Sequence, residues 1–206
     1  MVKERMHFKT TLFLFFILSL SMMACKKPGK NIDQVPAKTE KGYNMVVEIP
    51  AGTNHKFEFN KSNGKFEVDQ IAGKDRIIDF LPYPGNYGFI PSTFMDPERG
   101  GDRDALDILL ISESLETGSV VEVKPIAALM LKDRGEIDTK IIAIPVDSSR
   151  QVMEVRDFQH FLIEYDAAKK ILEDWFLNYK GFGKTEFIGW KDDVYAIREI
   201  NKWIIQ

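Results

Sequence analysis

The densest group of reactive side chains in this chain is an acidic run at residues 100–107, GGDRDALD. Asp102, Asp104 and Asp107 lie within six residues, and such carboxylates repel one another unless water or a cation lies between them. The two glycines before them allow a tight bend, so the acids can converge. Clustered carboxylate oxygens suit a hard divalent cation. A solvated acidic turn is the alternative, and the spacing alone does not exclude it.

A second charged segment, DRGEIDTK at residues 133–140, lies between two apolar runs. In an extended conformation Asp138 and Lys140 lie on the same face of the chain. Glu48 and Glu58 add carboxylates on earlier apolar segments. The alternative interpretations are a charged hairpin and the polar outer face of half-buried strands.

Apolar patterns predict the elements that must position these acids. Phe57 and Phe59 alternate with charged residues, as in a half-buried strand, and an Asn-Gly turn follows them. A helical period from Phe161 to Tyr179 predicts a helix that Gly181 ends. Strands are expected at residues 45–49, 55–60, 65–70, 105–111, 120–131 and 140–144, and a last helix at 193–201. Short strands followed by helices favour an α+β domain, a small closed β-barrel with helices packed outside.

Residues 1–24 have the form of a signal peptide, with a basic start and an uncharged apolar run that is too short to span a bilayer. Ala24 precedes Cys25, the only cysteine of the chain, which resembles a bacterial lipobox. Met22 stands where that motif usually has leucine, and a cleaved secretory signal or a buried cysteine is the alternative. The pattern predicts an exported protein, anchored to a bacterial membrane by a lipid on Cys25 and facing the periplasm or the exterior.

This interpretation divides the chain into three parts: a signal peptide at 1–24, a polar tether at 25–43, and one domain at 44–206. The single cysteine excludes a disulfide scaffold and a cysteine-based zinc site. The formal net charge of −3 becomes more negative when the basic leader is removed, which argues against binding to nucleic acid.

Six blocks, taken in order, resemble the soluble family I inorganic pyrophosphatases. They are VEIPA at 47–51, KFE at 56–58, YPGNYG at 83–88, GDRDALD at 101–107, the segment 133–140, and NYK at 178–180. The resemblance spans residues 45–190 and implies a five-stranded OB-like barrel with flanking C-terminal helices. It also implies hydrolysis of inorganic diphosphate to two phosphates by a metal-activated water, with Mg²⁺ as cofactor and Mn²⁺ or Zn²⁺ as substitutes.

The resemblance further implies a role for each matched residue. Asp104 would deprotonate the attacking water, and Tyr87 would be a second catalytic residue. The implied metal ligands are Asp102, Asp107 and Asp138, with Asp133, Glu48 and Glu58 as further carboxylates. The implied phosphate-binding residues are Lys56, Tyr87, Lys140, Tyr179 and Lys180, and Tyr83 matches a tyrosine of lesser importance. Related enzymes form dimers or hexamers, so a homo-oligomer is expected.

Three positions depart from the family pattern. Arg103 replaces a small or short polar residue, Ala105 replaces proline or an acid, and Gln70 replaces an arginine. A short insertion, residues 71–75, leads to Arg76, and our hypothesis is that Arg76 supplies the missing phosphate contact. Arg103 could shield the acidic cluster or point to solvent.

Three other functions remain open at this point. A non-catalytic OB-type binding module would use the barrel to bind oligonucleotides or sugars. A different metal-dependent phosphohydrolase would act on nucleotides or phosphate esters. A Ca²⁺-binding envelope protein would use the same carboxylates with no base role for Asp104.

Overall fold

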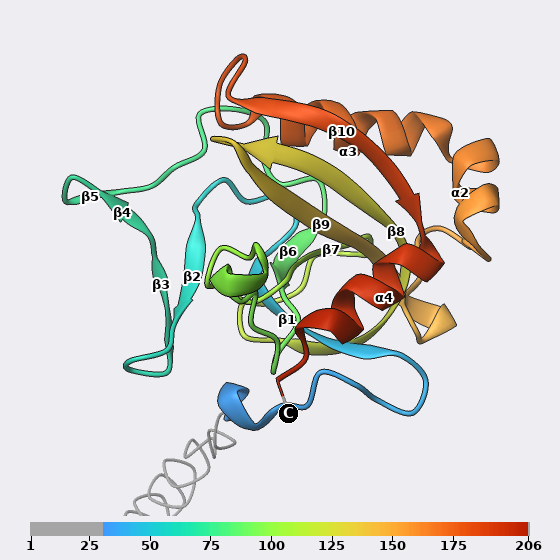
Figure 1. The fold of residues 1–206 in the computed structure, drawn as a ribbon, viewed down its shortest axis with the longest axis horizontal. Coiled ribbons are helices and arrows are strands. Elements are labelled where there is room, and N and C mark those ends of the chain that lie inside the picture. Colours follow the sequence, from blue (N-terminus) through green and yellow to red (C-terminus); the bar gives the residue numbers. More distant parts are fainter. Residues whose placement is uncertain (1–30, 206) are drawn as a thin grey trace, which may run out of the picture. The chain divides into compact units, whose positions relative to one another are not determined.

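The computed structural model describes residues 31–205, and its central element is a closed ring of five strands (Figure 1). In ring order these are β1 (Tyr43–Ile49), β6 (Asn86–Phe89), β7 (Asp107–Leu110), β9 (Glu136–Pro145) and β8 (Val120–Asp133). A second pairing, between β8 and β1, closes the ring. Neighbouring strands are antiparallel except β7 and β9, which are parallel. The predicted fold class, a closed five-stranded barrel with C-terminal helices, is confirmed.

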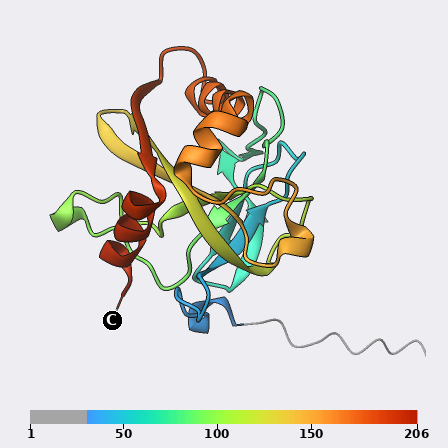
Figure 2. The ribbon, with the colours of Figure 1, turned by 90° about the vertical axis from the view of Figure 1, so that its right-hand side faces the viewer.

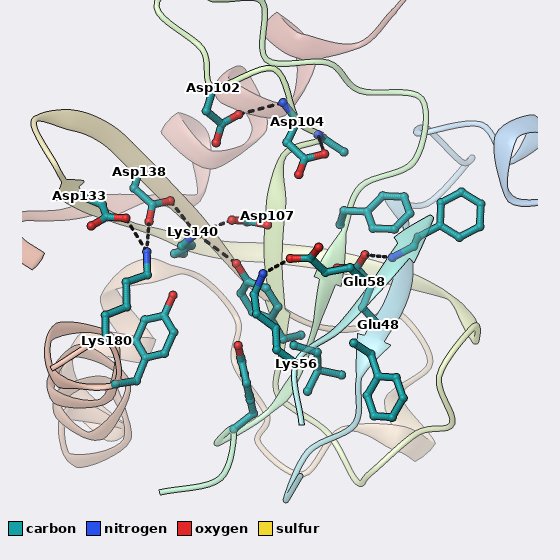
Figure 3. Close-up of a pocket in the computed structure, with 18 of the residues that line it drawn as sticks. Glu48, Lys56, Glu58, Asp102, Asp104, Asp107, Asp133, Asp138, Lys140 and Lys180 are labelled. Atoms are coloured by element: carbon teal, nitrogen blue, oxygen red, sulfur yellow. Dashed lines mark hydrogen bonds and ion pairs between the residues drawn. The ribbon is translucent and has the colours of Figure 1, made fainter. Parts of the chain in front are cut away.

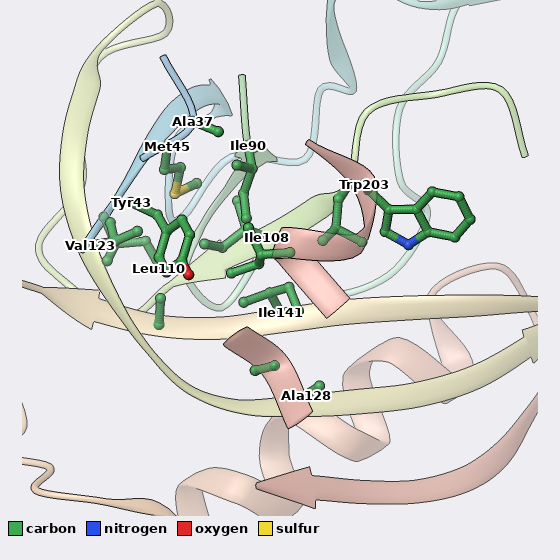
Figure 4. Packing of buried hydrophobic residues seen from close by; sticks show 14 of the residues in the cluster. Ala37, Tyr43, Met45, Ile90, Ile108, Leu110, Val123, Ala128, Ile141 and Trp203 are labelled. Carbon is green, nitrogen blue, oxygen red and sulfur yellow. The ribbon is translucent and has the colours of Figure 1, made fainter. Parts of the chain in front are cut away.

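The strands of the ring bury apolar side chains on both faces. Ile108, Leu109 and Leu110 are consecutive and fully buried, which requires a packed layer on each side of β7. Ile108 and Leu110 belong to a cluster that also contains Trp203 (Figure 4), whereas Leu109 belongs to a second cluster with Phe176. The continuous apolar run in the sequence is therefore a strand between two cores.

The two cores are covered by different C-terminal helices, which Figure 2 shows on different sides of the barrel. The elements are α2 (Phe158–Glu164), α3 (Asp166–Asn178), β10 (Thr185–Asp192) and α4 (Asp193–Trp203). β10 is a sixth strand that pairs with β8 outside the ring. The single helix expected over 161–179 is two helices, because Tyr165 leaves the helical conformation (φ −123°, ψ 27°). The predicted apolar face is nevertheless the buried one.

Two small hairpins lie beside the barrel. β2 (Phe57–Asn60) and β3 (Lys65–Val68) form the predicted hairpin, whose turn contains Gly64 at φ 68°. β4 (Gln70–Ile71) and β5 (Lys74–Asp75) form the second, and this is the structure of the insertion. In the described residues, each hairpin pairs only with itself.

Residues 31–43, which we expected to belong to the tether, lie against the barrel. The 3-10 helix η1 (Ile32–Gln34) begins this segment, and Ile32, Val35 and Ala37 are buried. The sequence pattern missed this because the three apolar residues stand singly among polar ones. Cys25 and the expected signal peptide lie outside the described residues. From residue 31 to residue 205, no helix is both long and apolar enough to cross a membrane.

Two other 3-10 helices, η2 (Pro97–Arg99) and η3 (Ser148–Arg150), lie in loops. η2 belongs to the loop that precedes the acidic run. That loop is tied to the end of the chain, since the backbone N–H of Phe94 donates to the carbonyl of Trp203 (2.9 Å).

Candidate active site

A cavity of about 420 Å³ lies between the β2–β3 hairpin, the acidic run, the β8–β9 hairpin and the end of α3 (Figure 3). All fourteen residues that the sequence assigns to a site line it: Glu48, Lys56, Glu58, Arg76, Tyr83, Tyr87, Asp102, Asp104, Asp107, Asp133, Asp138, Lys140, Tyr179 and Lys180. Fold closure therefore gathers side chains that are far apart in the sequence. Their individual roles remain predictions.

The barrel strands place the deepest of these side chains. Asp107 is the first residue of β7, and Tyr87 lies on the neighbouring strand β6. Asp138 and Lys140 alternate on β9, so both side chains point into the cavity, as the sequence predicted. Asp133 is the last residue of β8, directly before the hairpin turn. These side chains of the barrel strands form the floor of the cavity: Tyr87, Asp107, Asp133, Asp138 and Lys140.

The lining carries more acids than bases, eight carboxylates against six cations. The carboxylates are Glu48, Glu58, Asp102, Asp104, Asp107, Asp133, Glu136 and Asp138, and the cations are Lys56, Lys61, Arg76, Arg134, Lys140 and Lys180. Burial raises the pKa of Glu48 to about 8, although the hydrogen bond that its carboxylate accepts from the Phe59 backbone N–H lowers this pKa. Even with Glu48 protonated, the acids outnumber the bases. A polyanion therefore needs additional cations to bind here.

Two lysines lie between the acids of the floor. The ammonium of Lys140 contacts Asp107 and lies 2.5 Å from Oδ1 of Asp138. The ammonium of Lys180 lies 2.8 Å from Oδ2 of Asp133 and 3.5 Å from Oδ2 of Asp138. Within residues 31–205, no three metal-binding side chains converge closely enough to hold an ion in this arrangement. Lysine ammonium groups are the counter-ions of these acids.

Burial and charge set the protonation of the floor. Burial alone would lower the pKa of Lys140, but Asp107 and Asp138 outweigh it and hold that pKa well above the usual lysine value. Burial would likewise raise the pKa of Asp138, but Lys140 and Lys180 lower it overall. Burial raises the pKa of Tyr87 well above its ordinary value, so its hydroxyl stays protonated. Lys140 also donates a hydrogen bond to the Tyr87 hydroxyl (3.1 Å).

Backbone contacts fix the acidic run. The backbone N–H of Met95 donates to the carbonyl of Asp104 (2.7 Å), and that of Arg103 donates to the carbonyl of Met95 (2.9 Å). The Asp104 N–H donates to Oδ1 of Asp102 (3.0 Å). A Cβ on Gly101 would lie 2.3 Å from the Met95 carbonyl oxygen, so the close approach requires glycine. Arg103 has φ 73°, is exposed and is absent from the cavity lining, which agrees with the solvent-facing alternative.

Basic residues from the two hairpins form the opposite wall. Lys56 pairs with Glu58, and Arg76 pairs with Asp69 (3.0 Å between Nη1 and Oδ2). Lys61 lies 3.3 Å from Oδ1 of Asp104. The sequence analysis missed Lys61. Its signal was the hairpin turn after Glu58, which returns the chain toward the acidic run.

Aromatic stacking positions the last part of the wall. The rings of Trp175 and Tyr179 stack at 4.5 Å and 12°, and the ring of Tyr83 lies 4.5 Å from that of Trp175. The Trp175 indole N–H donates to the carbonyl of Leu81 (2.9 Å). These contacts fix the end of α3, and with it Tyr179 and Lys180, against the barrel.

The donor set fits a hard divalent cation. All potential ligands among the described lining residues are oxygens, and carboxylates dominate them, which is the chemistry that Mg²⁺ prefers. Lysines and tyrosines surround the acids and can donate hydrogen bonds to phosphate oxygens. The fold and the cavity together define a class: an α+β barrel protein with an acid-rich polar cavity whose donors suit divalent cations and a phosphate-containing anion.

Comparison with known proteins gives the particular family. The inorganic pyrophosphatase family model matches residues 45–206. An inorganic pyrophosphatase of Sulfolobus acidocaldarius is 34% identical over 171 residues, which cover 79% of this chain and 86% of that protein. One of Synechocystis is 32% identical over 168 residues, which cover 79% of this chain and 90% of that protein. The crystal structure of the Thermus thermophilus inorganic pyrophosphatase superposes with a TM-score of 0.72 at 27% identity, covering 84% of this chain and 97% of that one.

The chain therefore belongs to the inorganic pyrophosphatase family, whose members are metal-dependent hydrolases of phosphoanhydride bonds. The expected resemblance is confirmed at the level of the family. The match begins at residue 45 and so excludes the segment 31–44, which nonetheless packs against the barrel.

Proposed function

We propose that this chain hydrolyses inorganic diphosphate to two phosphates with Mg²⁺ as cofactor. The observation that supports the proposal is the single cavity in which acids, lysines and tyrosines from six separate parts of the sequence meet. Diphosphate carries several negative charges, which repel a nucleophile from its phosphorus atoms. A site for its hydrolysis must therefore combine cations with positively charged or hydroxyl donors.

The metal ligands that we propose are Asp102, Asp107 and Asp138, with Asp133, Glu48 and Glu58 as further carboxylates around them. Bound divalent cations would neutralise phosphate oxygens and lower the pKa of a bound water toward neutrality, and Mn²⁺ or Zn²⁺ could replace Mg²⁺ in this function. In the structure described here, Lys140 and Lys180 lie between three of these acids. Metal ions held by these acids would replace the two ammonium groups as counter-ions, and both ammonium groups would then be available to phosphate oxygens.

Asp104 is the base that we propose. Its side chain is 76% exposed and lines the cavity, so it can reach a water molecule, while its backbone is fixed by Met95. A carboxylate suffices as a base when the water to be deprotonated is already acidified. Asp104 would orient the water toward phosphorus and accept its proton.

The remaining residues would hold the phosphates. Tyr87 keeps its proton because of burial, and so it can donate a hydrogen bond to the anion. Tyr83 packs against the ring of Tyr87 and supports it (5.3 Å between centroids). The proposed phosphate contacts are Lys56, Arg76, Lys140, Tyr179 and Lys180. Transfer of the proton to the leaving phosphate completes the reaction without a covalent intermediate.

Phosphate release tests the proposal when it is measured with diphosphate, ATP and a phosphate monoester, each with Mg²⁺ and with EDTA. We expect release from diphosphate alone, and only with Mg²⁺. Hydrolysis of ATP or the monoester in place of diphosphate would replace the proposal with a different phosphohydrolase. Ca²⁺ or Mg²⁺ binding with no hydrolysis of any substrate would leave a metal-binding or OB-type binding protein.

We also propose that the chain is exported and anchored by a lipid on Cys25. The support is the sequence of residues 1–25 alone, a basic start and an apolar run that end at the only cysteine. Incorporation of radioactive palmitate by the wild type but not by Cys25→Ala would support the anchor. Equal labelling of both would refute it.

A homo-oligomer is the last part of the proposal. Of the apolar C-terminal residues, Trp203 lies in the core, whereas Ile205 is exposed and can contact a second chain. Light scattering after size exclusion measures the mass directly. A monomer at micromolar concentration would contradict this part.

A further inference from the structure

The segment that precedes the family match, residues 31–44, packs directly beneath the candidate site. Ile32 is 8% exposed and Val35 is 5% exposed, so both side chains are buried although most of their neighbours in the segment are exposed. The carbonyl of Val35 accepts a hydrogen bond from the Ser92 hydroxyl (2.9 Å), which anchors the segment. The segment is therefore a part of the folded domain, and its contacts can bear on the site.

Ile32 belongs to a small apolar cluster of its own, separate from the two large cores. Its members are Ile32, Val46, Phe89 and Ala105, and Phe59, Phe66 and Val120 pack against them. Three of these residues, Phe59, Phe89 and Ala105, also line the cavity. The cluster is thus the underside of the site.

The β2–β3 hairpin depends on this cluster for its position. In the described residues the hairpin strands pair only with each other, so no ladder of backbone hydrogen bonds joins them to the barrel. Two residues of β2 make the connection. Phe57 packs against the second core. The ring of Phe59 lies 6.1 Å from that of Phe89 in the small cluster, and the Phe59 N–H donates to Oε1 of Glu48 (2.8 Å). The hairpin carries Glu58 on β2 and Lys61 in its turn, so its docking sets where both side chains lie.

The acidic run also contacts the small apolar cluster, because Ala105 is one of the cluster's members. Ala105 follows Asp104 directly, and the Ala105 N–H donates to Oδ1 of Asp104 (2.8 Å). Because the Asp104 side chain is 76% exposed, its position depends on this backbone and on the packing of Ala105. Ile32 is the member of the cluster that lies outside the family match, and the cluster also contains Ala105 of the acidic run and packs against Phe59 of the hairpin.

We propose that Ile32 is a positioning residue for the proposed diphosphatase reaction, on which this inference rests. Its side chain holds the β2–β3 hairpin and the acidic run at a fixed separation. Loss of its methyl groups leaves the barrel intact and lets the hairpin move relative to Asp104.

The test compares Ile32→Ala with Val35→Ala, a matched control that is equally buried in the same segment but lies outside the cluster, and with the conservative Ile32→Val. Hydrogen exchange of the substrate-free full chain is the first readout. We expect faster exchange in residues 57–68 and 102–106 for Ile32→Ala only, with the β8 and β9 amides unchanged. This readout needs no activity, so it tests the docking even if the proposed reaction is refuted.

Steady-state kinetics with Mg²⁺ and diphosphate are the second readout. A 1 Å displacement of reacting groups costs up to about 100-fold in rate, so we expect kcat to fall about 10- to 100-fold in Ile32→Ala and to recover in Ile32→Val. Val35→Ala should keep its kcat although it loses thermal stability. Equal exchange in the hairpin of both alanine variants, or an unchanged kcat and KM in Ile32→Ala, would overturn the proposal.

Discussion

Lys140 gives the sharpest prediction, because it is a buried cation between two acids. Its side chain is 4% exposed, and replacing it with methionine keeps the length and the apolar stem but removes the charge. Asp107 then loses its ammonium partner, and Asp138 keeps only that of Lys180. Removing one partner of a buried ion pair costs about 3–5 kcal/mol. For a domain of this size, about 2–4 °C per kcal/mol converts that cost to roughly 6–20 °C in Tm.

The same substitution should increase the affinity for divalent cations, although it lowers the stability of the metal-free chain. In the metal-free Lys140→Met chain, Asp107 has no ammonium partner and Asp138 has only Lys180, so Mn²⁺ relieves a repulsion there. In the wild type Mn²⁺ must displace the Lys140 ammonium. We expect Mn²⁺ to bind the variant at least about tenfold more tightly, which corresponds to about 1.4 kcal/mol. Diphosphate binding should weaken, because a phosphate contact is lost.

Thermal unfolding in EDTA and in excess Mn²⁺, together with a Mn²⁺ titration followed by electron paramagnetic resonance, measures both effects. Lys61→Met is the matched control, since Lys61 also pairs with an acid of the site but is 58% exposed. An exposed pair contributes about 0–1 kcal/mol, so this variant should keep its Tm within a few degrees. A Lys140→Met chain that is as stable as the wild type in EDTA, or that binds Mn²⁺ more weakly, would refute the reasoning.

Three further predictions concern the walls of the site. Arg76→Ala should raise the KM for diphosphate about tenfold or more, because a charged hydrogen bond contributes about 1.5–3 kcal/mol, and an unchanged KM would rule out its phosphate contact. Gly101→Ala should lower kcat by up to about 100-fold, because its Cβ would lie 2.3 Å from the Met95 carbonyl oxygen. Gly100→Ala meets nothing within 4 Å but is strained at φ 83°, so it should lose stability and retain more activity. Burial in the folded chain raises the pKa of Glu48 from 4.5 to about 8, so the folded chain holds a proton that the unfolded chain releases. The free energy of unfolding of the metal-free protein should therefore fall as pH rises from about 5 to about 8. Glu48→Gln should flatten that slope.

The barrel and the composition of the cavity could be predicted because their signals are local. Ile108, Leu109 and Leu110 form a continuous apolar run, and Asp138 and Lys140 alternate on one strand. The six sequence blocks that resemble the pyrophosphatase family occur in the same order along this chain, so the family pattern predicts which residues meet in the cavity. The role of each residue does not follow from its position in the cavity.

Long-range packing explains what could not be predicted. β10 has little apolar alternation, since its strand is an outer addition to β8 with mostly exposed side chains. The break at Tyr165 does not interrupt the apolar face, so the periodicity continues through it. Ile32 stands alone among polar residues, and only the tertiary structure supplies its partners. The ion pair of Lys140 with Asp107 likewise joins β9 to β7, two strands that lie far apart in the sequence.

Asp104 tests the central claim, metal-dependent hydrolysis of diphosphate in this cavity, most directly. Single-turnover phosphate release by the wild type and by Asp104→Asn should be measured together with the number of Mn²⁺ ions bound per chain. Removal of a general base costs about 10²–10⁴-fold in rate, so we predict a loss of that size with metal binding retained. Turnover of Asp104→Asn at the wild-type rate, or a wild type that releases no phosphate from diphosphate with Mg²⁺, would contradict the account.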